Sequence, residues 1–416
     1  MYEGSVLPQS QQDERKPFRL RLVTLLLLVF LPTITETEAR REARQPAGNV
    51  EDVEELARGP KKSATEKADP YKHAILIELE SGKVLFEKDA HTPVPPASMV
   101  KMMTTLIALE KIQTGTLHLT DPVVVSRWAE QMGGSQVYLK EGETFTVEEM
   151  LEAVMIHSAN DATTAIAEHI AGSTDAFVDL MNEKAEQLGL KETRYFSVHG
   201  LPAEAGQQDD EMSAYDLAML GRELMKYPEA AKWAATAQEP FRNGQFTLYN
   251  PNHLLRRYPN ADGIKTGFHN KAGFCVTGSA KRGDLRLIVV VMGSRTKRDC
   301  FGSATQILNE GFSSYRLYVP VKQGAALDKE AIVKGGVEER VPVASSADVK
   351  VLLKRGEEKK VAVEIQIPDR ISAPIIAGQV VGEVVVKLDG VEVGKTAVTA
   401  TKDIAQASFW KRWWPF

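Results

Sequence analysis

Cysteine is nearly absent from this chain of 416 residues, which contains only Cys275 and Cys300. Two cysteines exclude the disulfide framework that holds small secreted domains together. In an oxidising compartment they permit one bridge, and otherwise they pack as two buried thiols, so both possibilities stay open. Neither cysteine stands in a metal-ligand spacing, and the eight histidines form no His-Glu-x-x-His pair. We therefore expect no metal and no cofactor.

Two further features are missing. The formal net charge is -5, and no basic cluster carries interleaved aromatic residues, which argues against a nucleic-acid partner. The apolar run 22–31 is too short to span a bilayer comfortably. It follows Lys16, Arg19 and Arg21, which is the arrangement of a secretory signal peptide. We expect 1–39 to be a signal peptide or an uncleaved N-terminal anchor, and the remainder to be exported.

The rest of the chain divides by composition into four parts. Residues 40–69 are charged and poor in large apolar side chains, as in a flexible linker. Residues 70–318 carry alternating strand and helix patterns, with a hairpin at 74–86, two apolar strands at 273–280 and 285–292, and helices between them. This order predicts an α+β domain in which helices cover one antiparallel sheet.

The C-terminal part has a different character. Residues 319–402 contain short Val-, Ile- and Lys-rich runs separated by glycine, proline and charged turns, which predicts a small all-β domain. Residues 403–416 end in three tryptophans, two phenylalanines and two basic residues. This composition favours a tail that anchors the protein at a membrane surface, with a tail packed on its own β domain as the alternative.

Three short motifs stand out within 70–318. Ser98 and Lys101 are spaced S-x-x-K at the start of an apolar helical run, Ser158 and Asn160 form S-x-N, and Lys265-Thr266-Gly267 follows. The S-x-x-K spacing alone is weak evidence, because it recurs at Ser294 and at Ser408. Those copies lie in a polar turn and in the aromatic tail. Only Ser98 precedes an apolar helix and belongs to the ordered set of three motifs.

The residue types in this set suit acyl transfer. Residues three apart share a helix face, so Lys101 can remove the proton of Ser98 and make it a nucleophile. This requires a neutral lysine, which burial and the nearby cation Lys265 would favour. Ser158 can pass the proton to the departing amine and Asn160 can hold the substrate amide, although an isolated serine there would simply cap the next helix.

The third motif predicts the start of a strand at a sheet edge. Lys265 and Thr266 offer a charge and a hydroxyl to a carboxylate, and Gly267 lets a peptide lie alongside the edge. The backbone N–H groups of Ser98 and Phe268 are the candidate donors to the oxyanion.

With its three motifs in this order, the chain resembles the serine D-alanyl-D-alanine carboxypeptidases, the low-molecular-mass penicillin-binding proteins. The resemblance covers 70–318, and the β domain and aromatic tail follow that family's plan. It implies the β-lactamase/penicillin-binding-protein-like transpeptidase fold, release of D-alanine from the peptidoglycan stem pentapeptide, and acylation by β-lactam antibiotics. It also implies a location on the periplasmic face of the cytoplasmic membrane, with peripheral attachment.

The chain departs from the family pattern in three places. Ala159 replaces a glycine in the middle motif, Phe268 replaces a polar residue after Lys-Thr-Gly, and Cys300 aligns with an arginine of many relatives. We expect Arg298 or Arg295 to supply a cation in that corner, if any residue does.

Three further functions are compatible with the same residues. A β-lactamase would need a carboxylate for deacylation, and Glu204 and the cluster 209–211 offer one between the second and third motifs. A D,D-endopeptidase could share every catalytic residue named above. A non-catalytic cell-wall-binding protein is the least favoured of the three, because the serines and lysines of all the motifs are intact.

Overall fold

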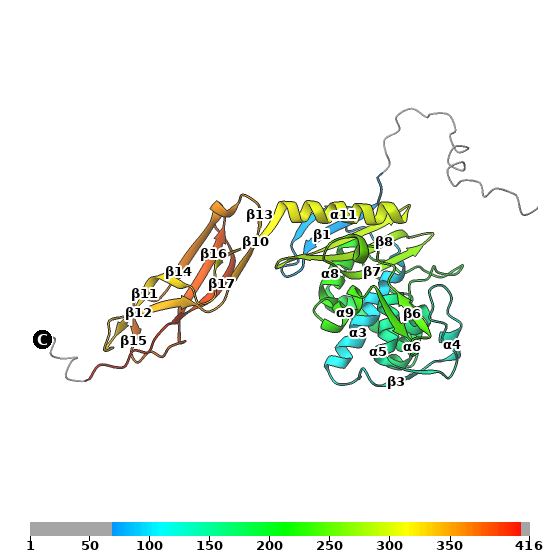
Figure 1. Cartoon of the computed structure of the whole chain (residues 1–416), viewed down its shortest axis with the longest axis horizontal. Helices are drawn as coiled ribbons and strands as arrows, with labels where there is room; N and C mark the ends of the chain where they lie inside the picture. The colour runs from blue at the N-terminus through cyan, green and yellow to red at the C-terminus, as the bar shows by residue number, and fades with distance from the viewer. Residues whose placement is uncertain (1–68, 409–416) are drawn as a thin grey trace, which may run out of the picture. The chain divides into compact units, whose positions relative to one another are not determined.

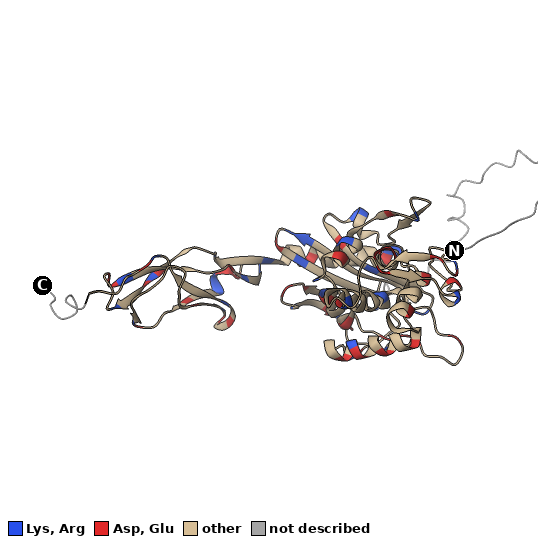
Figure 2. Ribbon diagram, turned by 90° about the horizontal axis from the view of Figure 1, so that it is seen from below, with Lys and Arg blue, Asp and Glu red and all other residues tan. Residues whose placement is uncertain are grey.

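The computed structural model of this chain describes residues 69–408 (Figure 1). The expected signal peptide or anchor, the linker up to residue 68, and residues 409–416 of the expected membrane tail lie outside the described residues. Among the described residues, no helix combines the length and apolar character needed to cross a bilayer. Lys, Arg, Asp and Glu are interspersed along the ribbon of this part of the chain (Figure 2).

A five-stranded antiparallel sheet organises the N-terminal part, as the sequence predicted. Its strands lie in the order β2 (Val84–Lys88), β1 (His73–Glu78), β9 (Leu285–Ser294), β8 (Gly273–Arg282) and β7 (Ala261–His269). The predicted hairpin at 74–86 corresponds to β1 and β2, and the two late apolar runs correspond to β8 and β9. Segments from the two ends of this region therefore meet in one sheet, and β7 lies at its edge.

Helices cover both faces of this sheet (Figure 1). The helices are α3 (Lys101–Gln113), α4 (Arg127–Glu130), α5 (Val147–Glu152), α6 (Asn160–Ala171), α7 (Thr174–Leu188), α8 (Ala214–Leu224), α9 (Pro228–Ala235), α10 (Leu254–Arg257) and α11 (Lys297–Ser314). Two small strand pairs complete this part: β3 (Pro122–Val124) with β4 (Thr144–Thr146), and β5 (Gln238–Phe241) with β6 (Phe246–Tyr249).

The alternation of side chains along the strands separates two cores. On β1, Ile75 and Ile77 face the core that contains α3, α6 and α8, whereas Ala74 and Leu76 face α11. Because both faces are covered, β1 is apolar almost throughout rather than alternating with polar residues. The sheet is thus fixed on both sides, which gives its edge strand β7 a rigid support.

The start of α3 differs from the prediction in detail. The sequence analysis placed Ser98 directly before an apolar helix, but Ser98 lies inside a 3₁₀ turn, Ala97–Val100, and α3 begins only at Lys101. No side chain caps this turn. The turn tightens the backbone immediately before the helix, and it carries the serine and the lysine from one element into the next.

The C-terminal part is all β, as expected. Strand β10 (Tyr315–Val321) pairs with β13 (Val349–Lys354), and a six-stranded sheet has the order β14 (Val361–Gln366), β16 (Val380–Leu388), β17 (Val391–Ala400), β12 (Arg340–Ser345), β11 (Ala326–Lys334) and β15 (Ile371–Ser372). Valines from several strands form its own core. Strand β11 gives a weak signal in the sequence, because it buries only Ala331 and Val333 among charged neighbours.

Two glycines in α11 provide a matched test of its packing. A Cβ on Gly311 would lie 2.5 Å from Leu76 Cδ2 and 2.8 Å from Leu287 Cδ1, whereas a Cβ on Gly302 would meet nothing within 4 Å. We predict that Gly311→Ala lowers the free energy of unfolding by about 1–3 kcal/mol through overpacking. Gly302→Ala should raise it by roughly 0.5–1 kcal/mol through helix propensity. Urea unfolding measures both, and equal effects of the two substitutions would contradict this packing.

Candidate active site

The predicted nucleophile and base lie within hydrogen-bonding distance. Lys101 Nζ is 3.0 Å from Ser98 Oγ, and it also donates to the carbonyl oxygen of His199 at 2.6 Å. Lys101 is fully buried, although it is a lysine in the first turn of a helix. The sequence anticipated the contact with Ser98 but not the one with His199, which is 98 residues away along the chain.

Two glycines let neighbouring segments approach the turn that carries Ser98. A Cβ on Gly267 would lie 2.5 Å from Pro96 O and 3.2 Å from Ser98 N. A Cβ on Gly200 would lie 2.2 Å from Ala97 O and 3.0 Å from Ser98 N, and Gly200 also has φ +77°. Both positions exclude any side chain. Gly267 therefore lets the turn that contains Ser98 pack directly on β7, in addition to the role at the sheet edge that the sequence suggested.

Ser158 lies between two helices, as the sequence predicted, but it does not cap the second one. A π-helical turn, Ala153–His157, follows α5, and Ser158 then adopts a left-handed conformation with φ 64°. The N-cap position of α6 is Ala159, whose side chain makes no capping bond. Non-glycine residues in this conformation are strained. Here the strain directs the Ser158 hydroxyl to Lys265, whose Nζ donates to Ser158 Oγ at 2.8 Å.

The side-chain amide of Asn160 is hydrogen-bonded through its nitrogen but not through its oxygen. Its Nδ2 donates to the carbonyl oxygen of Gly133 at 2.6 Å, and its backbone N–H donates to Ser135 O at 2.7 Å. Its Oδ1 has no hydrogen-bond partner among the described residues. A buried amide oxygen without a partner is costly unless a ligand satisfies it. Asn160 therefore joins the loop at 133–135 to the site and retains one acceptor.

The third motif lies within a long strand rather than at its start. Lys265, Thr266 and Gly267 are the fifth to seventh residues of β7 (Ala261–His269), at the sheet edge that was predicted. Lys265 is buried, and its Nζ also donates to Thr266 O at 3.3 Å. Phe268 follows with its side chain half-exposed, stacked on Phe274 with 4.2 Å between ring centroids.

A cavity of 310 Å³ opens between these elements. It is lined by Ser98, Ser135, His157, Ser158, Tyr249, Pro251, Thr266, Gly267, Phe268, Phe274, Cys275, Lys297, Cys300 and Phe301. The cavity thus contains both predicted hydroxyls and the edge of β7. Lys101, Asn160 and Lys265 lie behind this lining, and their hydrogen bonds to Ser98, to the carbonyl oxygen of Ser135 and to Ser158 connect them to it.

The two lysine amines are held in an environment that disfavours their charge. Burial, followed by the nearby charge of Lys265, holds the pKa of Lys101 well below its ordinary value of 10.5. Burial alone lowers the pKa of Lys265 to about 7. Burial and the charge of Lys101 lower the pKa of His199 to about 4, so this imidazole is neutral at pH 7. Neither lysine forms an ion pair within residues 69–408.

The remaining charges around the cavity differ from the expectation. The exposed cation in its lining is Lys297, in the first turn of α11, and neither Arg295 nor Arg298 lines the cavity. None of the described residues in the lining is acidic. Cys275 and Cys300 both line one wall as free, buried thiols, which decides between the two possibilities that the sequence left open.

The sequence missed several residues of this site because they carry no motif. The loop with His199 and Gly200, the loop around Ser135, and Tyr249 of β6 reach the site only through tertiary contacts. The apolar environment of Lys101 was the one local signal. Nothing in the local sequence around His199 indicates that its carbonyl will accept from a lysine almost a hundred residues earlier.

Comparison with known proteins shows the family to which this chain belongs. A family model described as D-alanyl-D-alanine carboxypeptidase matches residues 61–296, and one described as penicillin-binding protein 5, C-terminal domain, matches residues 315–406. The D-alanyl-D-alanine carboxypeptidase DacF of Bacillus subtilis (strain 168) is 39% identical over 352 residues, which are 84% of this chain and 89% of that protein. DacC of Escherichia coli (strain K12) is 33% identical over 82% of this chain and 86% of its own.

Solved structures agree as well. A peptidoglycan synthesis regulatory factor (PBP3) from Streptococcus pneumoniae superposes with a TM-score of 0.69 at 30% identity, covering 81% of this chain and 99% of its own. Penicillin binding protein 5 from Haemophilus influenzae gives a TM-score of 0.64 at 28% identity, covering 83% of this chain and 100% of its own. With its paired serine and lysine, its second serine and its edge strand, this chain belongs to the D-alanyl-D-alanine carboxypeptidase family of serine hydrolases.

Proposed function

We propose that this protein is a serine carboxypeptidase that removes the terminal D-alanine from peptidoglycan stem pentapeptides through an acyl-enzyme on Ser98. The observation that carries the proposal is the contact between Ser98 Oγ and the buried amine of Lys101 at 3.0 Å. A lysine with a lowered pKa can accept the serine proton, and Ser98 itself opens into the cavity.

Acylation follows from this pair. Ser98 Oγ attacks the carbonyl carbon of the D-Ala-D-Ala bond while its proton moves to Lys101 Nζ. The backbone N–H groups of Ser98 and Phe268 are our candidates for donors to the oxyanion, because both residues line the cavity. The carbon–nitrogen bond then breaks, and the leaving amine receives a proton through Ser158, which Lys265 orients at 2.8 Å. Asn160 Oδ1 accepts from an amide N–H of the substrate.

Water then hydrolyses the ester, with Lys101 as the base again. The cavity lining offers no carboxylate among the described residues, which favours slow release of a β-lactam over rapid turnover by a β-lactamase. None of the carboxylates that the sequence singled out lines the cavity, and two of them have other partners. Asp209 pairs with Lys271 at 2.8 Å, and the buried Asp210 accepts from the backbone of residues 196 and 197. We place the endopeptidase activity second and a non-catalytic role third.

The free carboxylate of the substrate requires a positive partner, and we assign this role to Lys297. The hydroxyl of Thr266 is a second donor to the same carboxylate. Lys265 is less suitable for direct contact because it is buried and bonded to Ser158. Lys297 is exposed, lines the cavity, and stands at the N-terminus of the 18-residue helix α11. Our expectation that Arg298 or Arg295 fills this corner is therefore replaced by Lys297.

We also propose where the protein acts and how its chain is divided. Residues 1–39 direct export, residues 40–69 tether the enzyme, 70–318 form the peptidase domain, 319–402 the β domain, and 403–416 attach the protein to the periplasmic face of the membrane. The apolar run at 22–31 and the aromatic, basic end of the tail support this assignment. Cell-wall peptide at the membrane surface would then be within reach of Ser98.

The acyl-enzyme can be located directly. After brief exposure to penicillin, mass spectrometry of proteolytic fragments should show the added mass on the peptide that contains Ser98. Ser98→Ala should abolish both the adduct and the release of D-alanine, because no nucleophile remains. Ser294→Ala, which removes a second S-x-x-K serine, should leave the adduct in place. An adduct on any other serine would show that Ser98 is not the nucleophile.

The pH dependence of acylation tests the base. Lys101 accepts a proton only when neutral, so the acylation rate should be high above its pKa and fall as pH decreases through that value. Because the pKa is well below 10.5, the rising limb should lie far below that of an ordinary lysine. Lys101→Arg keeps the charge at every accessible pH and should slow acylation by about 10²–10⁴-fold. A rising limb centred near 10.5 would refute this role.

Recognition of the carboxylate can be separated from chemistry. Lys297→Gln should lower kcat/KM by roughly tenfold to a hundredfold for a peptide ending in free D-Ala-D-Ala, because one charged hydrogen bond is lost. The same variant should hardly change kcat/KM for the C-terminally amidated peptide. Arg298→Gln, in the same helical turn but outside the cavity lining, is the matched control. If Arg298→Gln had the larger effect, the assignment of Lys297 would be wrong.

A further inference from the structure

Tyr138 combines a strained backbone with an exposed ring, and the catalytic site explains neither feature. Its backbone has φ 58°, a conformation that strains a tyrosine and that glycine adopts freely. Its side chain is 65% exposed, although it is a large aromatic. It does not line the catalytic cavity. A strained backbone that holds an aromatic ring in solvent is a reason to look for a ligand.

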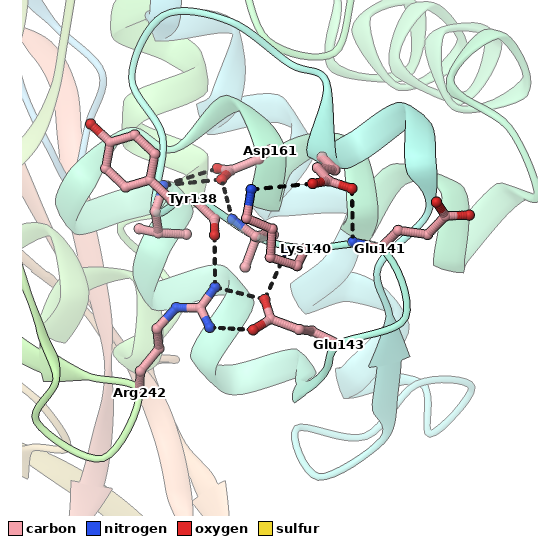
Figure 3. A network of polar contacts seen from close by, with 9 residues as sticks. Tyr138, Lys140, Glu141, Glu143, Asp161 and Arg242 are labelled. Atoms are coloured by element: carbon pink, nitrogen blue, oxygen red, sulfur yellow. Dashed lines mark hydrogen bonds and ion pairs between the residues drawn. The ribbon is translucent and has the colours of Figure 1, made fainter. Parts of the chain in front are cut away.

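A network of polar contacts holds Tyr138 in this position (Figure 3). The buried carboxylate of Asp161 accepts from the backbone N–H groups of Val137 and Leu139, each at 3.1 Å from Oδ2. Arg242 Nη2 donates to the carbonyl oxygen of Tyr138 at 3.0 Å, and the guanidinium also forms a two-pronged ion pair with Glu143 at 2.6 and 2.7 Å. The residues on both sides of Tyr138 are therefore fixed, while its ring points away from the network.

The ring belongs to an aromatic path that leads to the cavity. Tyr138 meets Phe246 edge to face at 6.2 Å between centroids, and Phe246 meets His157 at 5.4 Å. His157 lines the cavity, as does the exposed Tyr249, whose backbone N–H donates to His157 Nδ1 at 3.2 Å. Burial lowers the pKa of His157, so this ring is uncharged at pH 7. We call the ring pair of Tyr138 and Phe246 the aromatic shelf, and His157 links it to the cavity.

The cations beside the shelf are already paired with carboxylates. Arg242 binds Glu143, and Lys140 binds Glu130 at 3.2 Å. The shelf thus offers flat apolar faces and a tyrosine hydroxyl, and the one exposed carboxylate of this network without an ionic partner within residues 69–408 is that of Glu141, which can accept from hydroxyl groups. A neutral, flat and hydroxylated ligand fits this chemistry, since an aromatic ring packs on the C–H face of a pyranose while hydroxyls bond at its edge. A charged peptide segment would need ionic partners instead.

We propose that the aromatic shelf binds a sugar ring of the glycan strand to which the stem peptide is attached, so that the enzyme recognises glycan-linked peptide beyond the bond that it cuts. The inference rests on the proposed function, because the same substrate must reach Ser98 and the shelf together. Tyr138 is a specificity residue in this assignment, and it contributes nothing to bond cleavage.

The test compares three substrates with the full-length enzyme: a short acyl-D-Ala-D-Ala peptide, the stem pentapeptide, and the same pentapeptide carrying its disaccharide. The wild type should have a higher kcat/KM for the disaccharide pentapeptide than for the free pentapeptide. Tyr138→Gly should reduce that preference by about tenfold, the value of one good aromatic contact, and leave the short peptide unaffected. Tyr138→Phe should keep most of the preference.

Folding and function are separable here. Glycine relieves the strain at φ 58°, so Tyr138→Gly should be at least as stable to heat as the wild type, and loss of preference would not reflect unfolding. Asp389→Gly, which relieves a φ of 49° in the β16–β17 turn, is the control for this substitution and should leave the preference unchanged.

Three results would overturn the inference. The first is that the wild type shows no preference for the disaccharide pentapeptide, and the second is that Tyr138→Gly leaves the preference unchanged. The third is that Tyr138→Gly lowers kcat/KM equally for the sugar-free pentapeptide, which would indicate that the shelf binds peptide. NMR titration with the disaccharide alone keeps the two proposals apart. Shifts that Tyr138→Gly abolishes would support the shelf even if the wild type released no D-alanine, which would refute only the proposed function.

Discussion

The burial of two lysines side by side, without an ion-paired acid among the described residues, is the constraint on which the site depends. Lys101 and Lys265 are almost completely removed from solvent, and their amines bond only to hydroxyl and carbonyl oxygens. Charging both amines in such a place is unfavourable, so the fold itself holds at least one of them neutral. A carboxylate bonded to either lysine would stabilise its charge and remove the base.

The fold supports this arrangement through close backbone contacts. The turn that carries Ser98 is held between β7 at Gly267 and the loop at Gly200, neither of which tolerates a side chain. The sheet beneath β7 is packed on both faces, so its edge does not shift. Strained backbone occurs at Ser158, which lines the cavity, and at Ala97, whose φ is 51° and which directly precedes the lining residue Ser98. The stability of the two cores offsets this strain.

The sequence predicted the parts of this molecule that are local. The order of strands and helices, the edge strand that carries Lys265, and the contact of Ser98 with Lys101 all follow from spacing and apolar pattern. The sequence did not predict the partners that come from elsewhere in the chain, such as the His199 carbonyl or Lys297. It also misplaced the start of α3, because a 3₁₀ turn and an α-helix differ little in pattern over four residues. Strand β11 was not clearly predicted from the sequence, because most of its outward side chains are charged.

The neutral amine of Lys101 is the centre of this account, and NMR can titrate it directly. In protein labelled with ¹³C at lysine Cε, with Lys101→Met used to assign the resonance, the Lys101 signal should already have the chemical shift of a neutral amine at pH values far below 10.5. A titration midpoint at 10.5, as in an exposed lysine, would show that Lys101 is charged when Ser98 reacts and would contradict the mechanism.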